Sequence, residues 1–124
     1  MLVVDGMNVI GSRPTGWWRD RPAAVRALAV ELGRYARARG ETIVAVFDGE
    51  RSDLPELPEG VRVEFAAGPG PGAADERIAE LAREHGAGMR VVTSDRELGA
   101  RVREAGAEVL GAGGFRRELD ELGR

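Results

Sequence analysis

The sequence predicts an α/β protein with a mostly parallel central sheet. Short runs of branched apolar residues, typical of buried strands, alternate along the chain with segments whose apolar residues recur at helical spacing. This alternation is the pattern of a parallel sheet, in which right-handed crossovers place helices on both faces. The 124 residues show no internal repeat and no linker, so we expect one domain over residues 1–124.

The first part of the chain predicts a strand, a helix and a second strand. Residues 2–4 are a short apolar run, and a turn is expected at Gly6. Residues 11–21 form an irregular loop rich in Gly, Pro, Arg and Trp. Apolar residues then recur at helical spacing over 22–39, and the apolar run at 42–47 predicts a central strand.

The middle of the chain begins with a polar, proline-containing loop at 49–60. Apolar and charged residues alternate over 61–65, which predicts a half-exposed strand near an edge of the sheet. The Gly/Pro-rich segment 68–72 breaks the chain before a helix expected over 73–84. Residues 89–93 predict another buried strand.

The last part repeats the same alternation. A helix is expected over 96–103, followed by a short strand at 108–110. Phe115, Leu119 and Leu122 mark the apolar face of a closing amphipathic helix.

Aspartates stand where three of the predicted strands end, at Asp5, Asp48 and Asp95. The ligand crevice of an open parallel sheet lies outside the carboxyl ends of its strands, so we expect these carboxylates to gather there. Crowded carboxylates repel each other and attract a divalent metal ion. Each aspartate also has a simpler interpretation as a turn former or helix N-cap, Asp95 above all. Asp75 stands in the first turn of a helix, where the helix dipole alone favours an acidic residue.

Polar and aromatic residues near these aspartates are candidates for substrate binding. Asn8 can hydrogen-bond the backbone or orient a carboxylate, and the hydroxyl of Ser94 can reach a phosphate. Arg96 follows Asp95 directly. Aromatics interleaved with arginines in the loop after the first strand can stack single-stranded bases and hold phosphates. Alternatively, these aromatics pack on the core and the arginines lie in solvent. They are Arg13, Trp17, Trp18, Arg19 and Arg21.

Composition excludes several classes of site. The chain has no cysteine, and all 18 of its basic residues are arginine. A P-loop requires a lysine, as do the aspartate-based phosphotransfer sites, and disulfides and zinc–thiolate centres require cysteine. The net charge of −3 argues against a strongly basic nucleic-acid binder.

We expect a cytoplasmic protein without membrane association. Met1 leads directly into an apolar strand, with no charged leader and no cleavage site. No apolar run approaches the roughly 20 residues that span a bilayer. The sequence does not indicate an oligomeric state.

Five motifs occur in the order typical of NYN domains, and the sequence most resembles the YacP-like bacterial branch within the PIN-like nuclease class. The resemblance covers nearly the whole chain; singly the motifs are weak, but their ordered set is specific. Position 7 departs from the pattern, since Met stands where many relatives have an aromatic residue. The motifs are Val4-Asp5-Gly6-Met7-Asn8-Val9-Ile10-Gly11, Phe47-Asp48-Gly49, Ala74-Asp75-Glu76-Arg77-Ile78, Val92-Thr93-Ser94-Asp95-Arg96-Glu97-Leu98 and Gly113-Gly114-Phe115.

The resemblance implies a PIN-like three-layer α/β/α fold and a ribonuclease that depends on Mg²⁺ or Mn²⁺. Matched motif by motif, it implies catalytic and metal-binding roles for Asp5, Asp75 and Asp95. Asp48 is implied as a less certain metal ligand and Asn8 as the partner of the first-strand aspartate. The implied partner is RNA, including ribosome-associated RNA.

Two other functions remain open at this point. An RNA- or ribosome-binding PIN-like module with little or no activity accounts better for the acidic net charge. The complete aspartate set favours the enzyme, because clustered carboxylates facing a phosphate chain do not help a protein that only binds RNA. A toxin-like nuclease paired with an antitoxin is a weaker third possibility.

Overall fold

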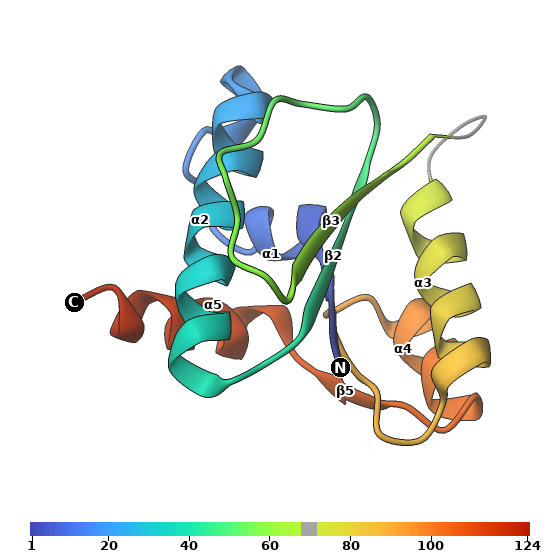
Figure 1. Ribbon diagram of the computed structural model, residues 1–124. Coiled ribbons are helices and arrows are strands. Elements are labelled where there is room, and N and C mark those ends of the chain that lie inside the picture. The colour runs from blue at the N-terminus through green and yellow to red at the C-terminus, as the bar shows by residue number, and fades with distance from the viewer. Residues whose placement is uncertain (68–71) are drawn as a thin grey trace.

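The computed structural model describes residues 1–67 and 72–124 (Figure 1). Most of the Gly/Pro-rich segment predicted to break the chain at 68–72 therefore lies outside the described residues. Within the described part, strands and helices alternate as the sequence predicts. No helix there is long and apolar enough to cross a membrane.

The elements in chain order account for most of the described residues. Besides a three-residue 3₁₀ helix, η1 (Trp17–Arg19), they are β1 (Leu2–Asp5), α1 (Gly6–Ile10), α2 (Arg21–Arg39), β2 (Ile43–Asp48), β3 (Val61–Ala66), α3 (Ala73–His85), β4 (Arg90–Val92), α4 (Arg96–Glu104), β5 (Glu108–Leu110) and α5 (Ala112–Leu122).

The five described strands form one sheet in the order β3-β2-β1-β4-β5, and every neighbouring pair is parallel. At the centre, Val3 of β1 lies opposite Val44 of β2 and Val91 of β4. The chain builds outward from β1 toward β2 and β3, then returns to the other side of β1 for β4 and β5. The carboxyl ends of β1 and β4 therefore border the switch point, where ligands bind in sheets of this kind.

Helices cover both faces of this sheet, so the protein has three layers. Figure 1 shows α2 and α5 on one side of the sheet and α3 and α4 on the other. One core lies under α1, α2 and α5 and includes Leu2, Val4 and Phe47; the other lies under α3 and α4 and includes Val3 and Val46. Successive strand residues enter opposite cores because side chains alternate along a strand. The predicted α/β/α sandwich is confirmed.

The expected turn at Gly6 is instead the start of a short helix, α1. This helix has only five residues, which is too short a segment to show the apolar periodicity from which a helix is predicted. Gly6 is buried, and a Cβ atom there would lie 2.3 Å from Cε1 of Phe47, so only glycine lets α1 pack this closely on β2. The loop at 11–21 likewise contains η1, and α2 begins at Arg21. The predicted half-exposed edge strand is correct, since β3 ends the sheet.

Candidate active site at the carboxyl edge of the sheet

Asp5 is a buried carboxylate at the end of β1, with 6% of its surface exposed. Its Oδ2 accepts a hydrogen bond of 2.9 Å from the hydroxyl of Thr93. Burial raises the pKa of Asp5 to about 6, and the negative charges of Asp75 and Asp48 add to the increase, while Thr93 and the Asn8 backbone amide oppose it. The ionised form of Asp5 is therefore destabilised by its surroundings.

The first turn of α3 brings Asp75 to the same crevice. Partial burial raises its pKa, and the charges of Asp95 and Asp48 raise it further, against the opposing effect of Arg101. Asp5 is in turn influenced by Asp75 and Asp48. Asp75 thus lies within electrostatic reach of Asp5, Asp48 and Asp95, which come from three other segments of the chain.

Asp48 and Asp95 each cap a helix. Oδ1 of Asp48 accepts a hydrogen bond of 2.9 Å from the backbone N–H of Ala74, at the start of α3. Oδ1 of Asp95 accepts one of 3.0 Å from the N–H of Leu98, so Asp95 is the N-cap of α4, the simpler role that the sequence left open. Neither cap requires the second carboxylate oxygen, which leaves that oxygen available to a ligand.

The donor set suits a hard cation that keeps part of its water shell. Carboxylates are the ligands that Mg²⁺ and Mn²⁺ prefer. Over residues 1–67 and 72–124, no group of three acidic or histidine side chains is arranged closely enough to hold a metal ion directly. Mg²⁺ is commonly held by one or two carboxylates and several waters, so four crowded but separate carboxylates fit a hydrated ion.

Three polar residues join the segments that carry these aspartates. The hydroxyl of Thr93 donates to Asp5 and accepts a hydrogen bond of 3.1 Å from the backbone N–H of Asp95. Oδ1 of Asn8 accepts a 2.7 Å hydrogen bond from the N–H of Ser94, whose own hydroxyl oxygen accepts one of 2.9 Å from Ala112. These contacts hold α1, α4 and α5 around the switch point. The link that Thr93 makes between two aspartates appears only when β1 and β4 pair.

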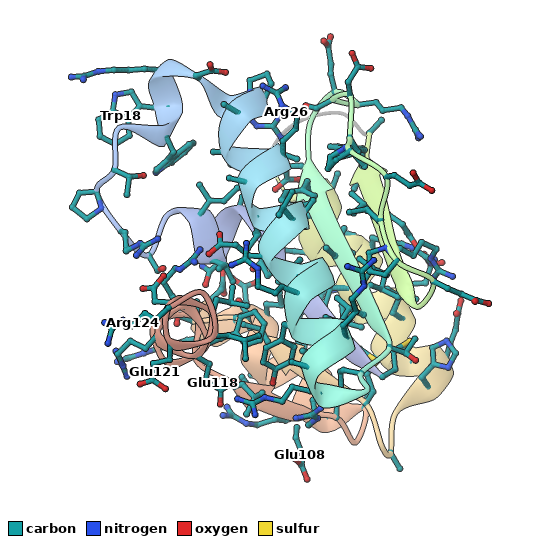
Figure 2. All side chains as sticks on the ribbon, turned by 60° about the vertical axis from the view of Figure 1, so that its left-hand side comes forward. Trp18, Arg26, Glu108, Glu118, Glu121 and Arg124 are labelled. Atoms are coloured by element: carbon teal, nitrogen blue, oxygen red, sulfur yellow. The ribbon has the colours of Figure 1, made fainter. Side chains whose placement is uncertain are left out.

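The predicted substrate-binding residues of the first loop are not all free for that role. Nη1 of Arg13 forms an ion pair of 2.8 Å with Asp120 of α5. Trp17 is partly buried against the core under α2, whereas Trp18 is 58% exposed and projects at the upper left of Figure 2. Arg96 is exposed at the start of α4.

Replacing the two tryptophans separately should divide packing from binding. Trp17→Ala is expected to lower the free energy of unfolding by about 2 kcal/mol, less than a fully buried Trp, because the side chain is only partly buried. Trp18→Ala should change stability by less than about 0.5 kcal/mol, and it should weaken single-stranded RNA binding if the ring stacks on a base. Thermal unfolding measures the stability of the two variants, and fluorescence anisotropy measures their affinity for RNA. An equal loss of stability in both variants would contradict the prediction.

A cleft of about 750 Å³ opens beside the crevice, between β3, α3 and α4. Asp75 lines it, together with two ion pairs, Arg77–Glu64 at 2.7 Å and Arg101–Glu76 at 2.9 Å. Five of its lining residues are acidic and two are arginine. This cleft repels a polyanion, so a phosphate chain is expected to approach the crevice from the α2 side.

The parallel sheet, the helices on both faces and the aspartates at the switch point define an α/β protein of the PIN-like nuclease class. The chain belongs to the YacP-like NYN domain family, whose model matches residues 2–124. The resemblance noted in the sequence is therefore confirmed. A search of the curated proteins found no match.

Two solved structures are similar over nearly the whole chain. One is Rae1 (YacP) from Bacillus subtilis, at 26% identity and a TM-score of 0.80, with 100% of this chain and 75% of that chain covered. The other is a point mutant of the same protein, at 27% identity and a TM-score of 0.81, with 99% and 76% covered.

Proposed function

We propose that the protein is an endoribonuclease dependent on Mg²⁺ or Mn²⁺, with residues 1–124 acting as one domain. The observation that carries the proposal is the gathering of carboxylates at the switch point, where burial and neighbouring carboxylates raise the pKa of both Asp5 and Asp75. A bound cation offsets that repulsion and attracts the phosphate that is cleaved. Membership of a nuclease family supports the same conclusion.

In this proposal each polar residue has a definite task. Asp5, Asp75 and Asp95 hold the hydrated ion directly or through water, with Asp48 beside them. Thr93 fixes the orientation of the Asp5 carboxylate through its hydrogen bond to Oδ2. The bound ion would lower the pKa of a water molecule and offset charge on the leaving oxygen. Asn8 and Ser94 keep the surrounding segments in place.

A second candidate is a PIN-like module that binds RNA or the ribosome with little activity. Two observations favour it: the net charge of −3, and carboxylates that do not converge on one point in the described residues. The two candidates differ in one measurable property, which is hydrolysis of RNA that requires a divalent metal.

The test compares wild type with Asp95→Asn. Asparagine is also a good N-cap, so the hydrogen bond to Leu98 and the melting temperature should be kept while one negative charge is removed. Calorimetric titration with Mn²⁺ is expected to show binding to wild type and weaker binding to the variant. Cleavage of labelled single-stranded RNA should fall about a hundredfold or more.

The matched control is Asp53→Asn, which changes the same charge on the exposed loop before β3 and should leave metal binding and cleavage unchanged. Cleavage by Asp95→Asn at the wild-type rate would contradict the site assignment. Metal binding without cleavage of any RNA would favour the binding module. Adding ribosomes to the same assay tests ribosome-associated RNA as the substrate.

A further inference from the structure

Arg21, the first residue of α2, packs its guanidinium group against the turn that follows β2. A Cβ atom on Gly49 would lie 3.1 Å from Nη2 of Arg21 and 3.3 Å from Cζ. Gly49 has φ +97°, so the turn and the close approach both depend on glycine here. Nη2 is buried and has no hydrogen-bond partner, and it is the one such side-chain atom in the described part of the chain.

The arrangement is unusual for this protein. Other partly or fully buried arginines have carboxylate partners: Arg116 pairs with Glu31 and Asp120, Arg90 with Glu41, and Arg77 with Glu64. Arg21 forms no ion pair with any described residue. A guanidinium group carries five donors, and burying some of them without an acceptor is costly.

The helix makes the position of Arg21 still less favourable. A cation at the start of a helix is opposed by the helix dipole. The nearest acidic residue in sequence, Asp20, already accepts a hydrogen bond of 3.1 Å from the N–H of Ala23 as the N-cap of α2. An anion beside Arg21 would let the guanidinium group turn outward, give Nη2 an acceptor and offset the positive charge at the start of the helix.

The location of Arg21 indicates which kind of anion would bind there. Gly49 directly follows Asp48, whose carboxylate bonds to α3 on one face of the sheet. The Gly49 turn contacts Arg21 of α2, and α2 covers the other face. Arg21 therefore flanks the carboxyl edge of the sheet on the side away from the acidic cleft. Arg101, and not Arg21, is the cation that lowers the pKa of Asp75. Arg21 is therefore not needed to offset the charge of that aspartate.

We propose that Arg21 binds a backbone phosphate of the RNA strand as it leaves the aspartate crevice toward α2. The inference rests on the proposed function for the identity of the strand. Once it turns outward from Gly49, the guanidinium group presents a planar fork that includes Nη2 and suits two phosphate oxygens. Arg21 is thus a substrate-binding residue, separate from the carboxylates that would carry the reaction.

Binding without cleavage tests the inference. The probe is a short fluorescein-labelled oligouridylate, its affinity measured by fluorescence anisotropy at several salt concentrations in an Asp5→Asn background with chelator present. Adding Arg21→Gln is expected to weaken binding about tenfold or more and to reduce the salt slope by about 0.7, the contribution of one phosphate contact in a single strand. Arg21→Lys keeps the charge but loses the fork, so its affinity should lie between the two.

The matched control is Arg37→Gln, at the opposite end of α2, where the arginine is exposed. It should leave affinity within about twofold of the background. The melting temperature of Arg21→Gln should be equal to or above that of the background, because the side chain of Arg21 makes no hydrogen bond to the described residues. A lower melting temperature with unchanged affinity would overturn the inference and assign Arg21 to packing.

The outcomes separate this inference from the proposed function. If wild type never cleaves RNA but Arg21→Gln weakens binding, the nuclease proposal fails and the role of Arg21 stands. If wild type cleaves RNA with metal while Arg21→Gln binds the probe like the background, the role of Arg21 alone is wrong. Absence of any binding by the background protein overturns the inference.

Discussion

Asp5→Asn is expected to stabilise the metal-free protein above about pH 7 by as much as about 3 kcal/mol, and to reduce RNA cleavage about a thousandfold or more. The gain in stability arises because burial and two neighbouring carboxylates raise the pKa of Asp5 from 3.8 to about 6. Asparagine removes the charge and keeps an oxygen that can accept the hydrogen bond from Thr93. The loss of activity is expected because, in the proposed function, the same charge holds the cation.

The stabilisation by Asp5→Asn should depend on pH, because it comes from the raised pKa of Asp5. Between about pH 4 and pH 6 the folded protein holds a proton on Asp5 that the unfolded chain has released, so wild type loses stability as the pH rises through this window. The variant lacks this loss, so the difference between the two should vanish below about pH 4. Urea unfolding of both proteins in chelator, across this range of pH, measures it.

Adding Mn²⁺ should reverse the order of stability. Wild type is expected to gain stability with metal concentration, because in the proposed function the ion binds the folded state, whereas Asp5→Asn should gain much less. Asp53→Asn, on the exposed loop, serves as the control and should follow wild type throughout. An Asp5→Asn protein that is less stable than wild type at neutral pH would show that Asp5 is a structural residue rather than a strained ligand.

Gly6→Ala should lower the free energy of unfolding by about 3 kcal/mol or more. The added Cβ would lie 2.3 Å from Cε1 and 2.4 Å from Cδ1 of Phe47. The Phe47 ring cannot move aside easily, because it is fully buried and stacks on Phe65 with ring centroids 5.7 Å apart. Equilibrium urea unfolding measures the loss, which should appear as a lower midpoint.

A double mutant tests whether the Phe47 ring causes the loss of stability in Gly6→Ala. Phe47→Leu removes the ring, so adding Gly6→Ala to it should cost much less than adding Gly6→Ala to wild type. Gly113→Ala is the control, because a Cβ there meets only Nη1 of Arg117 at 3.8 Å, and it should leave stability unchanged or raise it by up to about 1 kcal/mol. Equal costs of Gly6→Ala in the two backgrounds would mean that the ring is not the obstacle.

Much of the fold could be predicted because its information is local. Apolar runs mark the strands, and the alternation of apolar and charged residues over 61–65 marks β3 as an edge strand. Aspartates directly after apolar runs also predicted a gathering of carboxylates at one edge of the sheet. That prediction needs only the rule that parallel strands end at the same edge, and the effect of the Asp48 charge on the pKa of Asp5 agrees with it.

The individual partners could not be predicted in this way. Asp48 caps a helix that begins 25 residues later, Asn8 meets Ser94 across 86 positions, and Arg13 is held by Asp120 across 107. Each of these contacts depends on the strand order β3-β2-β1-β4-β5 and on which face each helix covers.

The amino-acid sequence by itself determined the class of fold and its family, and it predicted the acidic character of the candidate site. Only the tertiary structure decided that Trp17 packs inward while Trp18 is exposed, and that Gly6 must admit the Phe47 ring. It also decided that the guanidinium of Arg21 packs on Gly49 without an acceptor for Nη2. The physical reason is that periodicity reports which side of an element is apolar, whereas the partner on that side is set by packing between segments far apart in the chain.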